Sequence, residues 1–180
     1  MGSDFQKLVG SARLGFIGLV ESEFLRSPEL PANIDDLQKY FRQEVVDGPN
    51  RAPSEESKDE DEEQIYCTIR CRVWVDPAEE GENVSPEHSY DSAKMKISAS
   101  YIICFEATDS TSLSDEAVEK FCETIGAMAV WPYFRAHSSH CASEAVVALP
   151  TLPLKKATYP IKETNPGRSF REVLDKPETA

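Results

Sequence analysis

Two segments of the chain alternate between apolar and polar residues, and this pattern limits the fold more than any other. Every second residue from Ile65 to Val75 is apolar, and the stretch from Met95 to Glu106 repeats the alternation. A period of two is the period of an extended strand, whose side chains point to opposite faces in turn. The pattern predicts two half-buried β-strands.

Two further segments have strand character. The segment 14–25 is apolar on both faces, because strict alternation places Phe16 and Phe24 on one face and Leu19 on the other. A strand with two apolar faces needs two covers, or one cover and a ligand. The segment 37–46 fits either a helix or a strand, and we favour a fourth strand.

Two polar connectors separate the strands. The first, 47–63, contains SEESKDEDEE, with seven acidic residues against one lysine. The second, 76–92, is rich in Pro, Glu, Gly and Asn. Both are typical of solvated loops, and the simplest role of the acidic run is to keep the chain soluble.

After residue 109 the period becomes helical. Ser114 is a suitable N-cap, followed by two acidic residues that favour the helix dipole. Because proline is tolerated in the first turn of a helix, Pro132 is expected to open a second helix over 132–147. One stripe of that helix consists of Phe134, Ser138, Cys141 and Ala145. The residues after Phe134 are small, which favours close packing against another helix.

The charge argues against several classes of partner. The chain has 180 residues, with 32 acidic and 19 basic ones, and a formal net charge of −13. This charge opposes phosphate backbones and anionic lipids, so we expect neither nucleic acid nor membrane as a partner. No apolar run approaches the ~20 residues that span a bilayer, and we expect a cytoplasmic protein whose five cysteines are free and mostly buried.

Catalytic and metal-binding patterns are weak. His137, His140 and Cys141 have a helical spacing that brings two ligands to one metal, but no close pair supplies the remaining ligands. The sequence has no Gly-rich phosphate loop and no GxSxG or HExxH motif. We therefore expect no enzyme, no metal and no other cofactor, with the helical His and Cys cluster as the open alternative.

The order of four strands and a helix, followed by WPYFRAHSSHCASEAVVALPTLPL, resembles the SecB family of preprotein-holding chaperones. Trp131 to Arg135 are similar to the aromatic-Pro-Tyr-x-Arg opening of the family's long helix. Leu149 to Leu154 are similar to the leucine-proline segment that follows it. The resemblance implies an α+β fold in which a four-stranded antiparallel sheet is followed by two helices on one face. It assigns residues 1–155 to a single chaperone domain. The Pro, Gly and charge content of 156–180 predicts a loosely ordered tail.

In function, the resemblance implies an ATP-independent holdase that binds unfolded preproteins in hydrophobic grooves and passes them to the SecA motor. It also implies a homotetramer, a dimer of dimers with the long helices between two eight-stranded sheets. The two long loops look more like the SecB-like chaperones of toxin-antitoxin systems, whose client is an antitoxin. The alternative is therefore a dedicated antitoxin-binding module without transfer to SecA.

The predicted sites follow from these readings. The strand faces and the leucine-proline segment give the client-binding residues Phe16, Leu19, Tyr66, Trp74, Leu152 and Leu154. The small stripe of the second helix, Phe134, Ser138, Cys141 and Ala145, becomes the subunit interface. Glu21 and Glu23 are the partial counterparts of the acidic surface that docks SecA, and Ser98 stands where a further acid would be expected.

Overall fold

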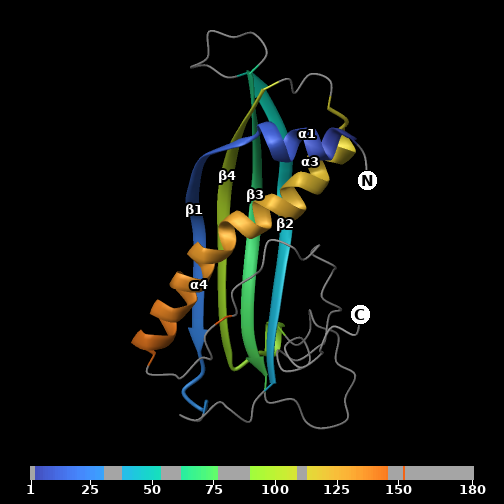
Figure 1. The fold of residues 1–180 in the computed structure, drawn as a ribbon. Coiled ribbons are helices and arrows are strands. Elements are labelled where there is room, and N and C mark those ends of the chain that lie inside the picture. The colour runs from blue at the N-terminus through green and yellow to red at the C-terminus, as the bar shows by residue number, and fades with distance from the viewer. Residues whose placement is uncertain are drawn as a thin grey trace, which may run out of the picture.

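The computed structural model describes residues 3–30, 38–53, 62–76, 90–108, 113–145 and Leu152. Four strands form one sheet: β1 (Arg13–Arg26), β2 (Gln38–Pro53), β3 (Glu62–Asp76) and β4 (Met95–Thr108). All neighbours are antiparallel, in the order β1-β4-β3-β2 (Figure 1). The four predicted strands are confirmed, including the ambiguous one over 37–46.

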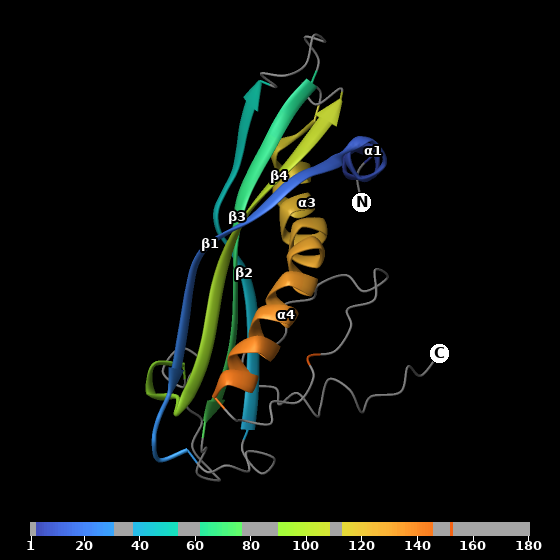
Figure 2. The same cartoon turned by 90° about the vertical axis from the view of Figure 1, so that its left-hand side faces the viewer.

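The helices lie on one side of this sheet, as predicted. They are α1 (Ser3–Ser11), α3 (Asp115–Phe121), the π-helical turn η2 (Cys122–Gly126) and α4 (Ala127–Glu144). Figure 2 shows α1, α3 and α4 on the same side, and of the described helical segments only the short turn at 90–92 lies on the opposite face of the sheet. We call this opposite side the open face. Helix α1, which packs beside α3, was not anticipated from the sequence.

The prediction that Pro132 opens a second helix is wrong. Pro132 lies inside α4, which follows α3 and η2 without a break. Proline inside a helix costs about 3 kcal/mol through the lost hydrogen bond and the clash with the preceding turn. Pro132 is exposed, whereas Trp131 and Phe134 beside it are 3% and 0% exposed. Burial of such side chains contributes about 1.5–3 kcal/mol each, enough to offset the proline.

The core lies between the helices and the alternating residues of the two central strands. Ile65 and Ile69 of β3 and Ile97 and Ile103 of β4 are completely buried there. At Gly126 the helical layer approaches β3 so closely that an added Cβ would lie 2.9 Å from Ile69 Cδ1. The glycine therefore permits η2 to rest directly on the strand.

The strands extend into both predicted connectors. β2 continues to Pro53 and β3 begins at Glu62, so the ends of the expected 47–63 loop are strand. β2 has irregular register around Gly48, whose φ of 91° suits glycine, and an added Cβ would lie 2.7 Å from the Tyr66 carbonyl oxygen. The middle of that connector, most of 76–92 and the boundary at residue 155 lie outside the described residues.

Candidate functional site

Strand β1 carries most of the large apolar side chains that the described residues expose. Nine such side chains are at least 40% exposed, and six of them lie on β1: Leu14, Phe16, Leu19, Val20, Phe24 and Leu25. β1 is also an edge strand of the sheet. An edge strand with uncovered apolar side chains is a ready surface for another polypeptide.

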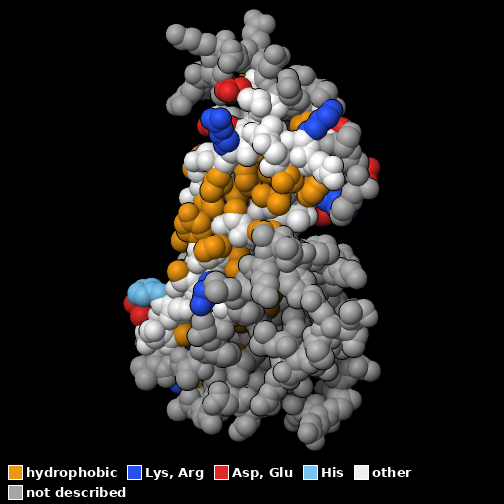
Figure 3. Space-filling model, viewed as in Figure 1, with side chains coloured by type: hydrophobic (Ala, Val, Ile, Leu, Met, Phe, Trp, Pro, Cys, Tyr) orange, Lys and Arg blue, Asp and Glu red, His pale blue; other side chains and the backbone are white. Residues whose placement is uncertain are grey.

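The register with β4 divides these side chains between the two faces of the sheet. Leu14, Leu19 and Phe24 lie opposite core residues and so face the helix side, whereas Phe16 and Leu25 are on the open face. Figure 3 shows hydrophobic side chains gathered on the helix side of the molecule. β1 therefore presents apolar surface in two directions, as expected for a strand with two apolar faces.

The predicted assignment of individual residues to these faces is wrong in part. Strict alternation placed Phe16 and Phe24 on one face, but the register shifts between Leu14 and Phe16 and again between Leu19 and Glu21. Each bulge adds one residue, and one extra residue moves all later side chains to the other face. Only the second shift lies between Phe16 and Phe24, so these two side chains lie on opposite faces.

The predicted client-binding residues that the structure describes lie on both faces of the sheet and in the core. Phe16 is 47% exposed on the open face, where its ring centroid lies 6.3 Å from that of the half-buried Tyr66. Leu19 is 53% exposed on the helix side. Leu152 is 5% exposed and belongs to the main core. Leu154 lies outside the described residues.

The expectation that Trp74 is an uncovered aromatic is wrong. Trp74 is only 3% exposed, because Tyr40 stacks on its ring at 5.4 Å and Tyr90 contacts it edge-on at 5.4 Å. Tyr90 comes from the single helical turn at 90–92, which follows a long connector in the sequence. The alternation of β3 alone could not show that a distant turn covers this end of the open face.

The small stripe of α4, predicted as a subunit interface, is covered within the single chain. Phe134, Ser138 and Cys141 are 0%, 2% and 7% exposed, and Ala145 packs against the same core. The helical period identified a packing face correctly, but that face rests on the chain's own sheet. The outward side of α4 carries Tyr133, which is 51% exposed and was not selected from the sequence.

The helical histidines and cysteine lie close together without forming a metal site. His137 Nε2 lies 3.7 Å from Cys141 Sγ, and His140 Nε2 lies 3.3 Å from a Glu144 carboxylate oxygen. Partial burial, with a smaller effect of His140, lowers the pKa of His137. In the described part of the chain, no three ligating side chains come together in a way that could hold a metal ion.

All five cysteines are free and buried, as predicted. Cys67 of β3 contacts Cys122 of η2 across the interface between sheet and helices. The hydrogen bond between the two thiols, together with burial, raises the pKa of Cys67. The Cys67 thiol is therefore a protonated packing group at neutral pH.

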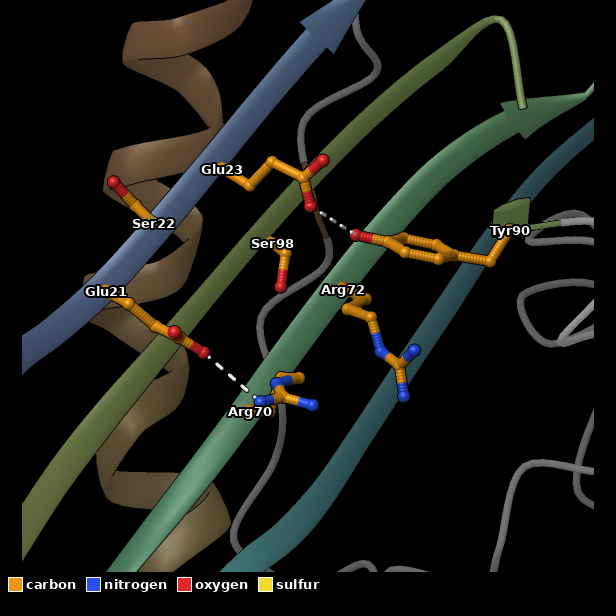
Figure 4. A pocket seen from close by; sticks show the side chains of 7 residues that line it. All are labelled: Glu21, Ser22, Glu23, Arg70, Arg72, Tyr90 and Ser98. Atoms are coloured by element: carbon orange, nitrogen blue, oxygen red, sulfur yellow. Dashed lines mark hydrogen bonds and ion pairs between the residues drawn. The ribbon is translucent and has the colours of Figure 1, made fainter. Parts of the chain in front are cut away.

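Glu21 and Glu23, predicted to dock a partner, line a polar hollow of about 240 Å³ on the open face. Figure 4 shows it between Glu21 and Arg70 on one side and Glu23 and Tyr90 on the other, with Ser98 between them. Glu21 accepts hydrogen bonds from Ser100 Oγ at 2.9 Å and Arg70 Nη2 at 3.1 Å. These bonds lower the pKa of Glu21, with Ser100 contributing most.

Glu23 is held more loosely. Lys96 Nζ lies 3.4 Å from one carboxylate oxygen, and the Tyr90 hydroxyl donates to the other at 3.4 Å. The Tyr90 ring lies between the Lys96 ammonium, 4.9 Å from its centroid, and the Arg72 guanidinium, 5.0 Å away. Both acids are thus partly neutralised by their own chain, while their side chains stay 61% and 53% exposed.

Comparison with solved structures identifies the fold. The chain is similar to the Mycobacterium tuberculosis Rv1957 SecB-like chaperone, solved in complex with a ChAD peptide from the Rv1956 HigA1 antitoxin. The TM-score is 0.57 at 15% sequence identity, and the match covers 86% of this chain and 98% of that one. The predicted SecB-like α+β fold is confirmed.

Comparisons of sequence alone give no relative. No family model matches the chain, and no curated protein matches it either. Within the described residues, no helix is both long enough and apolar enough to cross a membrane.

Proposed function

We propose that the chain is an ATP-independent holdase that binds unfolded or aggregation-prone polypeptides in the cytoplasm. The observation that carries this proposal is the concentration of exposed apolar side chains on one edge strand, in a sheet of SecB-like fold. Burial of a client's apolar side chains there lowers the concentration of the free unfolded chain. The proposed role is binding rather than catalysis.

The same edge supports a proposal for assembly. Pairing of β1 with a second copy would extend the sheet to eight strands, and the exposed outward side of α4 would pack between two such sheets. In a homotetramer built in this way, the apolar side chains of β1 that the assembly does not cover, on either face of the strand, would bind clients. Phe16, Leu19 and the half-buried Tyr66 remain the proposed client contacts.

Two kinds of client fit this surface, preproteins and an antitoxin. The similar mycobacterial chaperone was solved with an antitoxin peptide, which favours an antitoxin as the client here. Transfer to SecA is the weaker part of the proposal, because Glu21 and Glu23 are bonded within the chain. A dedicated antitoxin-binding module without SecA is the second candidate function.

Suppression of aggregation tests the proposal directly. A denatured, unrelated client is diluted into buffer with a stoichiometric amount of the protein, and light scattering follows both aggregation and mass. We expect suppressed aggregation and a complex of four chains plus client. Unchanged aggregation would overturn the holdase proposal. Binding of only one antitoxin, without competition from unrelated unfolded chains, would favour the dedicated module.

A further inference from the structure

The polar hollow on the open face exists because the central strand carries short side chains. Ser98 and Ser100 of β4 stand between glutamates of β1 and arginines of β3. Strands β1 and β3, which flank β4, lie about 10 Å apart, since neighbouring strands are about 4.8 Å apart. Long side chains can close that distance, and a hollow remains wherever they do not.

Two successive cross-strand rows behave differently. In the first row, Arg70 reaches over Ser100 and closes on Glu21, with the distances given above. Its Nε also donates to Ser100 Oγ at 3.3 Å. In the second row, Arg72 turns away from Glu23, pairs with Glu44 of β2 and lies against the Tyr90 ring (Figure 4). The second row, which we call the open row, is therefore not closed by an arginine, and the Tyr90 hydroxyl bonds there to both Glu23 and Ser98.

The walls of the hollow, which both rows line, have opposite hydrogen-bonding character. On the β1 side, ionised Glu21 and Glu23 can only accept hydrogen bonds. On the β3 side, Arg70 and Arg72 can only donate. A cation in the hollow meets the two arginines, and an anion meets the two glutamates. A neutral group that donates on one side and accepts on the other avoids both repulsions.

We propose that this hollow is a subsite for a carboxamide, the side chain of Asn or Gln in a bound polypeptide. The amide nitrogen donates to Glu23, and the amide oxygen accepts from Arg70 and from the Ser98 hydroxyl, which exchanges its hydrogen bond with Tyr90 for this one. The inference rests on the proposed function for its source of carboxamides, and it gives that function a sequence preference: apolar residues for β1 with Gln or Asn beside them.

A guest series tests the preference. Soluble labelled peptides of alternating Leu and Ser, with one central Gln, Met, Glu or Lys, are titrated against the full chain and followed by fluorescence anisotropy. We expect the Gln peptide to bind about tenfold more tightly than the Met peptide, because hydrogen bonds to charged groups are stronger than those between neutral groups. The Glu and Lys peptides should bind no better than the Met peptide. Equal binding of the Gln and Met peptides would overturn the proposal.

Variants assign the preference to the open row. Glu23→Met and Ser98→Ala should each remove most of the Gln preference and leave the affinity for the Met peptide unchanged. Glu29→Met is the matched control, because Glu29 is an exposed acid paired with Lys94 at 2.6 Å outside the hollow. It should keep the full preference. The same loss in Glu29→Met as in Glu23→Met would contradict the assignment.

A small probe separates this inference from the proposed function. If no peptide binds, the holdase proposal fails, and the hollow is tested alone with propionamide against propionate by NMR. We expect saturable shifts of the Ser98 and Tyr90 amides with propionamide only, and their loss in Glu23→Met. An equal response to propionate would identify an anion site and overturn the carboxamide proposal, as would no response to either probe.

Discussion

The two edges of the sheet are built in opposite ways. β2 is fastened to the helical layer: the Gln43 side-chain amide donates to the Ala127 carbonyl at 2.7 Å, and Arg51 Nη2 donates to the Leu113 carbonyl at 3.0 Å. Phe41 packs edge-on against Trp131, with ring centroids 4.6 Å apart. Strand β1, by contrast, carries six large apolar side chains that are exposed to solvent.

This difference separates stability from interaction. Irregular register around Gly48 and the charged Arg42 and Glu44 make β2 a poor template for another strand. Only Val46 on β2 exposes a large apolar side chain, against six such residues on β1. We therefore expect the side chains of β2 to contribute more to the free energy of unfolding, and those of β1 to contribute more to client binding.

Two phenylalanines, one on each edge, give the largest test. Phe41→Ala removes a half-buried ring packed on Trp131 and Phe134, and should lower the free energy of unfolding by about 2–4 kcal/mol. Phe16→Ala removes a ring that is 47% exposed and should cost less than about 1 kcal/mol. Urea denaturation measures both values. Equal losses would mean that the two edges are structurally alike.

Two glycines at the irregular positions sharpen the contrast. Gly48→Ala places a methyl group at a φ of 91° and 2.7 Å from a backbone oxygen, and should destabilise the chain by about 1–3 kcal/mol. At Gly15 of β1 the nearest atom to an added Cβ is 3.4 Å away, at the limit of ordinary contact. Gly15→Ala should therefore be nearly neutral in thermal unfolding. A larger effect at Gly15 would show that the β1 bulge is the more constrained one.

Alternation was sufficient to predict the strands but not which way each side chain faces. The core face of β3 follows directly from the spacing of Ile65, Cys67 and Ile69. On β1 the same rule failed at Phe24, because a bulge has no signature in hydrophobic period. Helix α1 was missed for a related reason: its packing on α3 and β4, distant in the sequence, makes Leu8 a core residue.

The candidate site was predicted in part for the same physical reason. A period shows which side chains share a face, but not what covers that face. Ser138 and Cys141 were therefore assigned to a subunit interface although the sheet covers them, and Trp74 was expected to be exposed although Tyr90 covers it. The apolar character of β1 on both faces needed no knowledge of its neighbours, and that part was predicted correctly.

Matched charge substitutions on the two edges separate binding from folding. Leu19 is 53% exposed on β1 and Val46 is 40% exposed on β2. Leu19→Asp and Val46→Asp should each change the free energy of unfolding by less than about 0.5–1 kcal/mol, because both sites are open to water. Only Leu19→Asp should weaken suppression of client aggregation. Equal loss of suppression in both variants would place the client surface on both edges.

The smallest effect concerns the closed row of the open face. The pKa of Glu21 is lowered, mainly by the Ser100 hydrogen bond and then by Arg70, so its contribution to stability is present above its ordinary pKa of 4.5 and is lost as the pH falls through the folded-state pKa. Ser100→Ala should move the Glu21 pKa upward, while Arg70 keeps it below the ordinary value. NMR titration of the Glu21 carboxyl carbon measures this shift. Ser98→Ala, in the open row, should leave the Glu21 pKa unchanged, because Ser98 does not bond to this carboxylate; an equal shift in both variants would mean that the two rows are electrostatically one site.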